Sequence, residues 1–488
     1  MSDLVLALDC GTHAVRVVTF DADSGQAAEV ATADLELLFP APGWVEIDPH
    51  HLASTTIEVL RTSLQRIAAD GHTVIGLGIT DMRETAFAWD KHNGQPLAPG
   101  VLWMSLQSQP VVDRWRSEGR EGLIRERTGL TNDTFFFGSK IAWLLEQVPQ
   151  VAAAQRDGRL AVGTVDSWLI HVLTGGREHR TDTSNASRTQ VLSLDSLDWD
   201  AELAAMVGID RAALPLLTDS AGQYGTTDPA VCGAAIPITG VMADQQASLL
   251  GHGGETPGSI KATFGTSGVV CANTGASAPL VDGLVTSVGW TGLDPSPCFE
   301  VEGSAFHSGY TVTWLREKFG VGPGDGPLGP ANTPAADRVY LLPSFTRLGA
   351  PRWPERRGAV IAGLGMDTEP VDVYRAGVEA MAFQVYDMIA ALGQRQESSA
   401  QISIDGGGSK NDYLCQVLAD LSGLTVVRPA FHELTSAGVA KAALAGLGRP
   451  APSHFGQQDS GADYFTPTED RYAREGYDQW TQLIEEIL

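Results

Sequence analysis

Short apolar runs alternate along the chain with longer segments in which apolar residues recur at helical spacing. Runs of strand length are LVLALD (4–9), VRVVTFD (15–21), VIGLGIT (74–80) and AAIPITGVM (234–242). Their almost continuous apolar character is typical of strands that are buried on both faces of a sheet. The segments 50–69 and 139–148 between these runs have the helical pattern. Strands that alternate with helices indicate an α/β architecture.

The second half of the chain repeats the pattern with which the first half begins. The segment SIKATFGTSGVVCAN (259–273) predicts a strand, a Gly-Thr turn and a strand, as does LALDCGTHAVRVVTF (6–20). We interpret this match as an internal duplication, in which two domains of one fold, 1–250 and 251–488, face each other.

The remaining pattern of the second half predicts two helices, one strand and two loops. The strand is QISID (401–405), and helices are expected at 371–392, with a buried apolar stripe, and at 413–423. The loops are the Pro- and Gly-rich stretch 320–337 and the tail after residue 454.

The charge balance limits the partners that the protein can have. Its 488 residues include 33 Lys and Arg against 59 Asp and Glu, a formal net charge of −26. Such a surface repels nucleic acid and anionic membranes, so we expect neither as a partner and expect any phosphate site to be local. The five cysteines form no CxxC pair, the N-terminus does not resemble a signal peptide, and no apolar stretch has the length of a membrane span. These features predict a cytoplasmic protein.

Two Gly-Thr turns and one glycine run are candidates for nucleotide contacts. Asp9 precedes the turn Gly11-Thr12, and Gly265-Thr266 forms the matching turn of the second half. Glycine lets backbone N–H groups approach phosphate oxygens, and two such hairpins in two domains can hold one polyphosphate between them. The run DGGGSKN (405–411) follows a predicted strand and is either a nucleotide contact or an ordinary glycine-rich loop. A P-loop and clusters with zinc-ligand spacing are absent from the sequence.

Polar residues after two other strands have roles that the pattern alone leaves open. Arg83 and Glu84 follow a strand, where they form either a solvated ion pair or hydrogen bonds to two hydroxyls of a polyol. Trp103 is either an apolar wall for such a substrate or part of the core. Asp244, in GVMADQQASLLG (240–251), stands where a strand becomes a helix. An acid in this place caps the helix, binds a cation or accepts a proton.

A series of motifs in order resembles the FGGY carbohydrate kinases, most strongly the glycerol kinases among them. The resemblance is carried by LALDCGT, PGWVEIDP, GITDMRETAFAWDKHNGQPL, TGLTNDTFFFGSKIAWLL, GTVDSWLIHVLTGG, TDTSNASRT, ADQQASLLG, FGTSG, FTRLGAPRW and DGGGSKND. It implies an actin-like ATPase (ribonuclease H-like) fold, in which two duplicated domains surround a central cleft. It also implies ATP as the phosphoryl donor, Mg²⁺ as the metal, and a homodimer or homotetramer.

The resemblance also assigns roles to particular residues. It implies that Asp244 is the general base that deprotonates the substrate hydroxyl, and that Asp9 holds the hydrated magnesium ion. The residues that it places at the nucleotide are Thr12, His13, Arg16, Thr266, Gly309, Thr313, Gly407 and Asn411. Those that it places at the polyol are Arg83, Glu84, Trp103, Phe135, Gln245 and Val269.

Several of these positions depart from the glycerol kinase pattern. Those kinases carry Tyr where this chain has Phe135, and Phe where it has Val269. The family's hydroxyl and Gln positions are also altered, at His13, Ala14 and Thr313. Asp and Arg, which usually follow the family's Trp, are replaced in WMSLQS (103–108). We therefore expect a kinase for glycerol or a slightly larger polyol or ketose. A pentulose kinase, or a sensor that binds sugar and nucleotide without turnover, remain alternatives.

Overall fold

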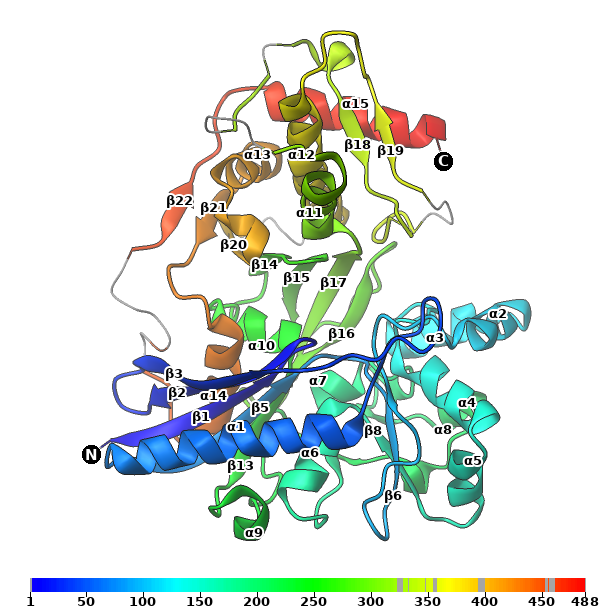
Figure 1. Cartoon of the computed structure of the whole chain (residues 1–488), viewed down its shortest axis with the longest axis vertical. Helices are drawn as coiled ribbons and strands as arrows, with labels where there is room; N and C mark the ends of the chain where they lie inside the picture. Colours follow the sequence, from blue (N-terminus) through cyan, green and yellow to red (C-terminus); the bar gives the residue numbers. More distant parts are fainter. Residues whose placement is uncertain are drawn as a thin grey trace.

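Two β-sheets, one in each half of the chain, form the centre of the protein (Figure 1). The computed structural model describes residues 2–322, 328–331, 333–346, 348–353, 358–393, 400–452, 455 and 461–487. The elements of the first half are β1 (Asp3–Cys10), β2 (Ala14–Asp21), β3 (Ala27–Asp34), β4 (Glu46–Ile47), α1 (Pro49–Ala69), β5 (Thr73–Asp81), β6 (Phe87–Asp90), β7 (Gly100–Val101), α2 (Gln109–Ser117), α3 (Glu121–Thr128), α4 (Phe137–Gln147), α5 (Pro149–Arg156), β8 (Leu160–Gly163), α6 (Val165–Leu173), β9 (Arg180–Asp182), α7 (Thr183–Ala186), β10 (Leu192–Ser193), β11 (Asp198–Trp199), α8 (Ala201–Val207), β12 (Leu216–Thr218), α9 (Pro229–Cys232), β13 (Ile238–Ala243) and α10 (Asp244–Gly251).

The second half continues the same alternation of strands and helices. Its elements are β14 (Ile260–Phe264), β15 (Gly268–Gly275), β16 (Val285–Trp290), β17 (Cys298–Ala305), α11 (Ser308–Phe319), β18 (Tyr340–Leu342), β19 (Val360–Ala362), α12 (Pro370–Ala391), β20 (Gln401–Asp405), α13 (Asp412–Ser422), β21 (Thr425–Arg428), α14 (Leu434–Gly446), β22 (Asp463–Phe465) and α15 (Tyr472–Ile487).

The two sheets share one strand plan. The first has the order β13-β5-β1-β2-β3, in which β3, β2 and β1 are antiparallel while β1, β5 and β13 are parallel. The second contains the order β17-β15-β14-β20-β21, with the same change from antiparallel to parallel pairing at the third strand. Gly11-Thr12 lies in the β1–β2 turn, and Gly265-Thr266 lies in the equivalent β14–β15 turn. The predicted duplication is therefore confirmed.

Separate hydrophobic cores hold helices against each sheet. α1 and α6 pack on the first sheet through residues such as Leu52, Leu60 and Leu169, which are fully buried. In the second half, α12 and α13 pack on the other sheet. The predicted apolar stripe of α12 comprises residues 371, 374, 378, 381, 385 and 388, and all of them except Val371 are buried. The periodicity therefore predicted both the helix and its buried face.

The C-terminal tail differs from the sequence-based expectation. We expected a loop after residue 454, but the chain forms β22 and the 16-residue helix α15 there. The helix buries Trp480 and Ile484 against the second core. Its remaining surface is polar, which is why a long apolar run did not indicate it. In the predicted loop at 320–337, the residues 323–327 and 332 lie outside the described residues.

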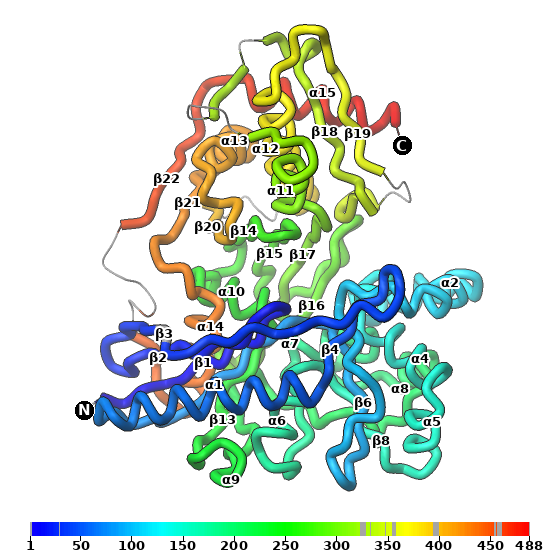
Figure 2. Tube along the Cα trace, viewed as in Figure 1, coloured from blue at the N-terminus to red at the C-terminus, as the bar shows by residue number. Residues whose placement is uncertain are grey.

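Helix α14 belongs to the second half in sequence but packs on the first sheet. It contacts β1, β5 and β13 on one side and α10 on the other, as the trace in Figure 2 shows. A Cβ atom on Gly438 of α14 would lie 1.8 Å from the carbonyl oxygen of Ala247, and one on Gly251 of α10 would lie 1.8 Å from that of Leu434. The two backbones therefore touch, and only glycine fits at the crossing. The division at residue 250 stays a prediction.

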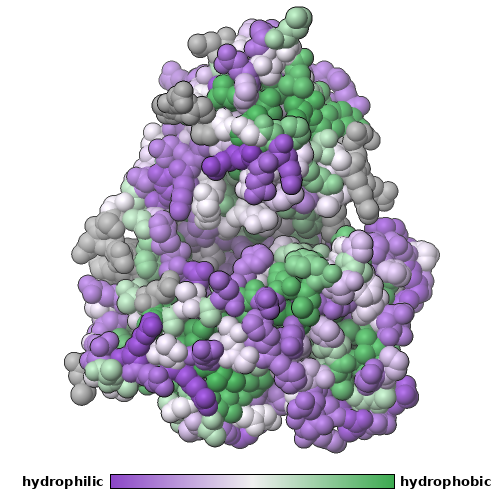
Figure 3. Space-filling view, viewed as in Figure 1, coloured by the Kyte–Doolittle hydropathy of each residue, from purple (hydrophilic) through white to green (hydrophobic). Residues whose placement is uncertain are grey.

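On the face shown in Figure 3, hydrophilic side chains surround several hydrophobic areas. The same view shows the surface hollowed between the two halves. Among the described residues, no helix is both long and apolar enough to cross a membrane.

The crossing of α10 and α14 gives a first prediction. Gly438→Ala should lower the free energy of unfolding by about 1–3 kcal/mol, because the new methyl group overlaps the Ala247 carbonyl. Gly122→Ala in α3 is the matched control, since no atom lies within 4 Å of its Cβ position, and it should be neutral or stabilising by up to about 1 kcal/mol. Chemical denaturation of both variants measures the difference. Equal stabilities would contradict a closed backbone contact.

Candidate active site

Asp244 lies where a buried strand becomes a helix. β13 ends at Ala243, which is the N-cap of α10, so Asp244 is the first residue within the helix. Its Oδ1 accepts a hydrogen bond from the N–H of Gln245 at 2.7 Å and lies 3.2 Å from Nε of Arg83. The N-cap alternative for Asp244 is therefore wrong. The side chain keeps 31% of its surface exposed, so the carboxylate is accessible.

The surroundings of Asp244 favour its protonated form more than water does. Its packing against protein raises the pKa to about 6; Arg83 opposes this rise, Glu84 adds to it, and Lys261 also opposes it. A carboxylate with this pKa is ionised at neutral pH but binds a proton more readily than an ordinary aspartate. That combination suits a proton acceptor.

Arg83 and Glu84 are buried, at 5% and 1% exposure, so the solvated-ion-pair alternative is wrong. They follow β5, and Glu84 adopts the left-handed backbone conformation with φ of 59°. Arg83 is bonded through Nη1 and Nη2 to both carboxylate oxygens of Glu302 on β17. Glu84 accepts a hydrogen bond from Nε of Arg188 at 2.6 Å. Glu302 and Arg188, to which the sequence assigned no role, therefore hold Arg83 and Glu84 in place.

An aromatic wall lies beside these charges. Nε1 of Trp103 donates a hydrogen bond to Oγ1 of Thr12 at 3.1 Å, and the Trp103 ring meets Phe135 edge-on with 5.7 Å between centroids. Phe306, at the end of β17, lies 6.4 Å from Phe135, measured between the ring centroids. Trp103 is only partly buried, which favours the wall over the core alternative. Val269 is 6% exposed and belongs to a different hydrophobic cluster, which also contains Met242.

The first hairpin places an acid and a base side by side. Asp9, at the end of β1, lies 3.8 Å from Nε of Arg16, whose Nη1 donates to Glu433 at 2.8 Å. Burial raises the pKa of Asp9 to about 7; Arg16 opposes the rise, while Glu433 and then Asp244 add to it. Asp9 and Asp244 thus repel each other electrostatically across the site. His13 in the same turn is exposed.

The second hairpin is held by the start of α11. The N–H of Gly309 donates to the carbonyl of Gly265 at 2.9 Å, and a Cβ atom on Gly309 would lie 2.4 Å from that oxygen. Glycine is therefore required at 309 for the helix to approach the turn that contains Thr266. Thr313 lies one turn further along α11 and is exposed.

The glycine run after β20 forms a tight turn at the start of α13. Gly406 has φ of +85° and its Cβ position lies 2.6 Å from the backbone of Phe264, so the conformation and the contact both require glycine. Gly407 is exposed and has no such contact. Asn411 caps α13 by accepting from the N–H of Leu414 at 3.2 Å. Asn411 thus has a structural role, whatever else it binds.

Lys261 connects the two groups of candidate residues. It is buried on β14, and its Nζ donates to Oε1 of Gln245 at 2.7 Å. It is the foremost of the charges that hold the pKa of Asp405 far below its usual range, although burial opposes this. Asp405 also accepts hydrogen bonds from Ser248 and His252 of the α10 region. The sequence gives no signal for Lys261, because a lysine within an apolar strand reads as an interruption.

Comparison with known proteins agrees with this arrangement. Residues 4–251 match the N-terminal domain of the FGGY family of carbohydrate kinases, and residues 260–447 match its C-terminal domain. The glycerol kinase of Aromatoleum aromaticum is 40% identical over 91% of this chain and 90% of its own length. That of Methylobacterium nodulans is 39% identical over 97% and 96%. The chain belongs to the FGGY family of carbohydrate kinases, which confirms the resemblance, and is thus a kinase.

Solved structures show the same two-domain fold. The crystal structure of Plasmodium falciparum glycerol kinase with ADP has a TM-score of 0.89 at 26% identity, and covers 100% of this chain and 98% of that one. The gluconate kinase of Lactobacillus acidophilus has a TM-score of 0.86 at 20% identity, over 100% and 98%. The predicted actin-like fold is confirmed.

The raised pKa of Asp9 makes the stability of the metal-free protein depend on pH. The folded state binds this proton more tightly than the unfolded state, so Asp9 lowers stability progressively as pH rises from about 4 to about 7. Asp9→Asn removes the penalty. In metal-free buffer its Tm should exceed that of the wild type by about 2–4 °C at pH 8 and match it at pH 4.

Asp21→Asn is the control for this measurement. Asp21 accepts hydrogen bonds from the N–H groups of Asp23 and Ser24, and these bonds lower its pKa, the Ser24 bond most. The substitution should therefore lower Tm at pH 8, the opposite sign. A Tm difference for Asp9→Asn that does not change with pH would show that Asp9 does not titrate in this range.

Proposed function

We propose that this protein transfers the γ-phosphoryl group of ATP to a hydroxyl of a small polyol or ketose, with Asp244 as the general base. The observation that carries the proposal is the accessible Asp244 carboxylate at the start of α10, 3.2 Å from Arg83 and with a pKa of about 6. A positioned base of this kind accepts the hydroxyl proton as the oxygen attacks phosphorus. The relatives named glycerol kinase support this reaction.

On the substrate side, we assign the polyol contacts to the charged and aromatic groups around Asp244. Arg83 and Glu84 provide a donor and an acceptor for neighbouring hydroxyls, and Gln245 adds a polar group. Trp103 and Phe135 form the apolar wall against the carbon chain. Val269, packed in its own cluster, contributes at most its edge.

On the nucleotide side, the two hairpins and the start of α11 hold the phosphates and the adenosine. Our assignment comprises Thr12, His13, Arg16, Thr266, Gly309, Thr313, Gly407 and Asn411. Mg²⁺ fits at Asp9, because carboxylate oxygens are ligands that this ion prefers and because burial, Glu433 and Asp244 raise the pKa of Asp9 despite Arg16, so that a further positive charge would stabilise its ionised form. When bound, the ion supplies positive charge to the phosphates.

We further propose a substrate with four or more carbons. Phe135 has no hydroxyl, so the site lacks one hydrogen bond with which a Tyr would select a short polyol.

A cytoplasmic location agrees with the five cysteines, all of which are free and buried. A homodimer or homotetramer remains part of the proposal.

Asp244→Asn tests the base. The variant should fold and bind nucleotide like the wild type, since an amide can still accept the Gln245 hydrogen bond, but kcat should fall by about 10²- to 10⁴-fold. In the wild type, kcat/KM should decline below a pH of about 6, and this decline should disappear in the variant. Asp200→Asn, at the N-cap of the distant α8, is the control and should keep full activity. A kcat within threefold of wild type would remove Asp244 from the mechanism.

A panel of polyols and ketoses tests the substrate. We expect a four- or five-carbon compound to exceed glycerol in kcat/KM. Phe135→Tyr should shift the ratio toward glycerol by about 3- to 10-fold, the value of one added hydrogen bond. Phe319→Tyr, on an exposed ring at the end of α11, is the control and should leave the ratio unchanged. A wild type that prefers glycerol to every longer compound would refute the proposed preference.

A further inference from the structure

Four charged side chains form a buried ring next to Asp244. Arg83, Glu84, Arg188 and Glu302 come from the ends of β5 and α7 and from β17, and all are between 0% and 5% exposed. Arg188 donates to Glu84 at 2.6 Å, to Oγ of Ser287 at 3.1 Å and to Glu302 at 3.1 Å. Glu302 in turn accepts from both terminal nitrogens of Arg83. Two positive and two negative charges thus balance.

Stability alone does not explain this ring. Removing four charges from water is costly, and buried ion pairs are often no more stable than apolar side chains of the same volume. The geometry has a different consequence. Because both terminal nitrogens of Arg83 are engaged by Glu302, only its Nε edge faces Asp244 at 3.2 Å and Glu84 at 3.8 Å. A guanidinium that turned its two-nitrogen fork to Asp244 would hold that carboxylate firmly ionised and weaken it as a base.

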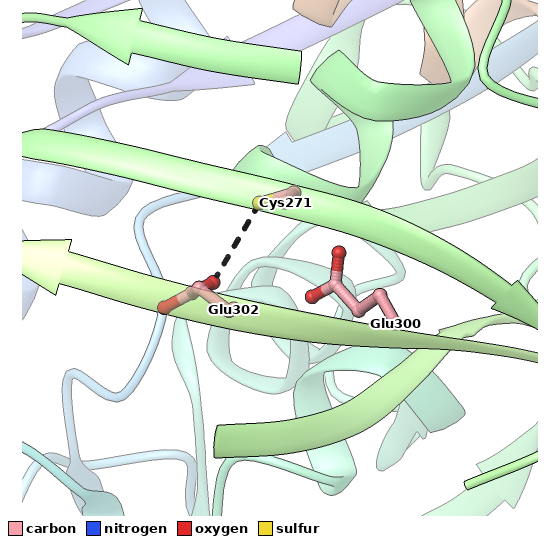
Figure 4. A group of neighbouring side chains, drawn as sticks. All are labelled: Cys271, Glu300 and Glu302. Carbon is pink, nitrogen blue, oxygen red and sulfur yellow. Dashed lines mark hydrogen bonds between the residues drawn. The ribbon is translucent and has the colours of Figure 1, made fainter. Parts of the chain in front are cut away.

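The neighbouring Glu300 differs from Glu302 in the charges that surround it, and therefore in its pKa. Glu300 and Glu302 extend from the same strand near Cys271 of β15, as Figure 4 shows. Burial and then Glu302 raise the pKa of Glu300 to about 7, and its Oε2 has no hydrogen-bond partner. For Glu302, burial opposes ionisation, but Arg188 and then Arg83 outweigh it and hold the pKa well below its usual range. A cation among these three residues would lie against two guanidinium groups, which argues against a metal site.

We propose that Glu302, held by Arg188, is a positioning residue that fixes the orientation of Arg83 and so keeps Asp244 available as a base. The inference rests on the proposed function, because it assigns Arg83 to the polyol and Asp244 to the proton. Glu302 comes from the second half of the chain, whereas Arg83, Glu84 and Asp244 come from the first. The orientation of the substrate contacts therefore depends on a side chain of the other half.

Glu302→Gln tests the inference, with Glu300→Gln as its matched control. Gln keeps the shape of Glu302 but cannot hold the guanidinium fork, whereas Gln at 300 resembles the protonated form of Glu300, which its raised pKa favours. We expect Glu302→Gln to raise KM for the best polyol of the panel about 10- to 100-fold, the scale of a misplaced positioning group. KM for ATP should change less than twofold. Glu300→Gln should leave both values within twofold of wild type.

The pH dependence of kcat/KM distinguishes a positioning role of Glu302 from a purely structural role. The charged groups that act on Asp244 are Arg83, Glu84, Lys261, Asp9 and Asp81. In Glu302→Gln, Arg83 is free to turn toward Asp244, so the acid limb of kcat/KM should move to lower pH by about one unit. Glu302→Asp, which keeps the charge, should restore the wild-type limb at least in part.

Several outcomes would overturn the inference. An unshifted acid limb with an unchanged polyol KM would do so, as would KM values for ATP and polyol that rise together with a loss of thermal stability. If Glu302→Gln does not fold, Arg188→Lys is used instead, because lysine keeps the positive charge but cannot make all three contacts of Arg188. An unchanged KM for the polyol in Arg188→Lys would also contradict the inference. If the wild type phosphorylates no compound of the panel, the proposed function is wrong. If the wild type is active but the polyol KM and the pH profile of the variant are unchanged, only this inference is wrong.

Discussion

The backbone contact between α10 and α14 is the constraint on which the rest of the structure depends. Gly251 and Gly438 let the two helices touch, and Gly78 and Gly240 let α14 lie directly on the first sheet, where a Cβ atom would meet its backbone at 2.7 Å or less. Each helix follows the parallel strands of one half and contacts the sheet of the other. Since α10 begins with Asp244, the position of this carboxylate is set by contacts between backbones rather than by adjustable side chains.

Charge that the fold has buried is the second determinant of the site. A chain with a net charge of −26 places Asp9 and Asp244 where burial raises the pKa of both. Such an arrangement costs stability in the absence of ligand, and active sites commonly accept this cost. Within the nearby ring of two arginines and two glutamates, Arg83 opposes the rise in the pKa of Asp244 more strongly than Glu84 adds to it, so the ring limits this rise without abolishing it.

The site is assembled from both halves. Glu302 and Lys261 reach from the second half to Arg83 and Gln245 of the first, through a buried and a partly buried hydrogen bond respectively. Within the first half, the bond from Trp103 to Thr12 joins the proposed polyol wall to the proposed phosphate hairpin. The proposed polyol wall and the proposed phosphate hairpin are therefore in direct contact.

The sequence by itself determined the central strands of both sheets, the helices α1, α4, α12 and α13, the duplicated hairpins and the family. Continuous apolar runs and helical periodicity depend only on which residues face a core, and they are local features of the chain. Asp9, Arg83, Glu84 and Asp244 could be singled out for the same reason, as polar residues directly after buried strands. The amphipathic helix α15 was missed although its buried residues Ala473, Gly476, Trp480 and Ile484 recur at helical spacing, because they are few and two of them are small.

Only the tertiary structure decided how these residues act together. Glu302 lies 219 residues from Arg83, Arg188 lies 104 residues from Glu84 and Lys261 lies 16 residues from Gln245, and nothing local marks their roles. Burial of Arg83 and Glu84, the pKa of Asp244 and the packing of α14 on the opposite sheet all arise from contacts between distant segments. The pKa of a buried group depends on how far the folded protein excludes water from it and on which charges lie nearby. Neither quantity can be read from the order of residues along the chain.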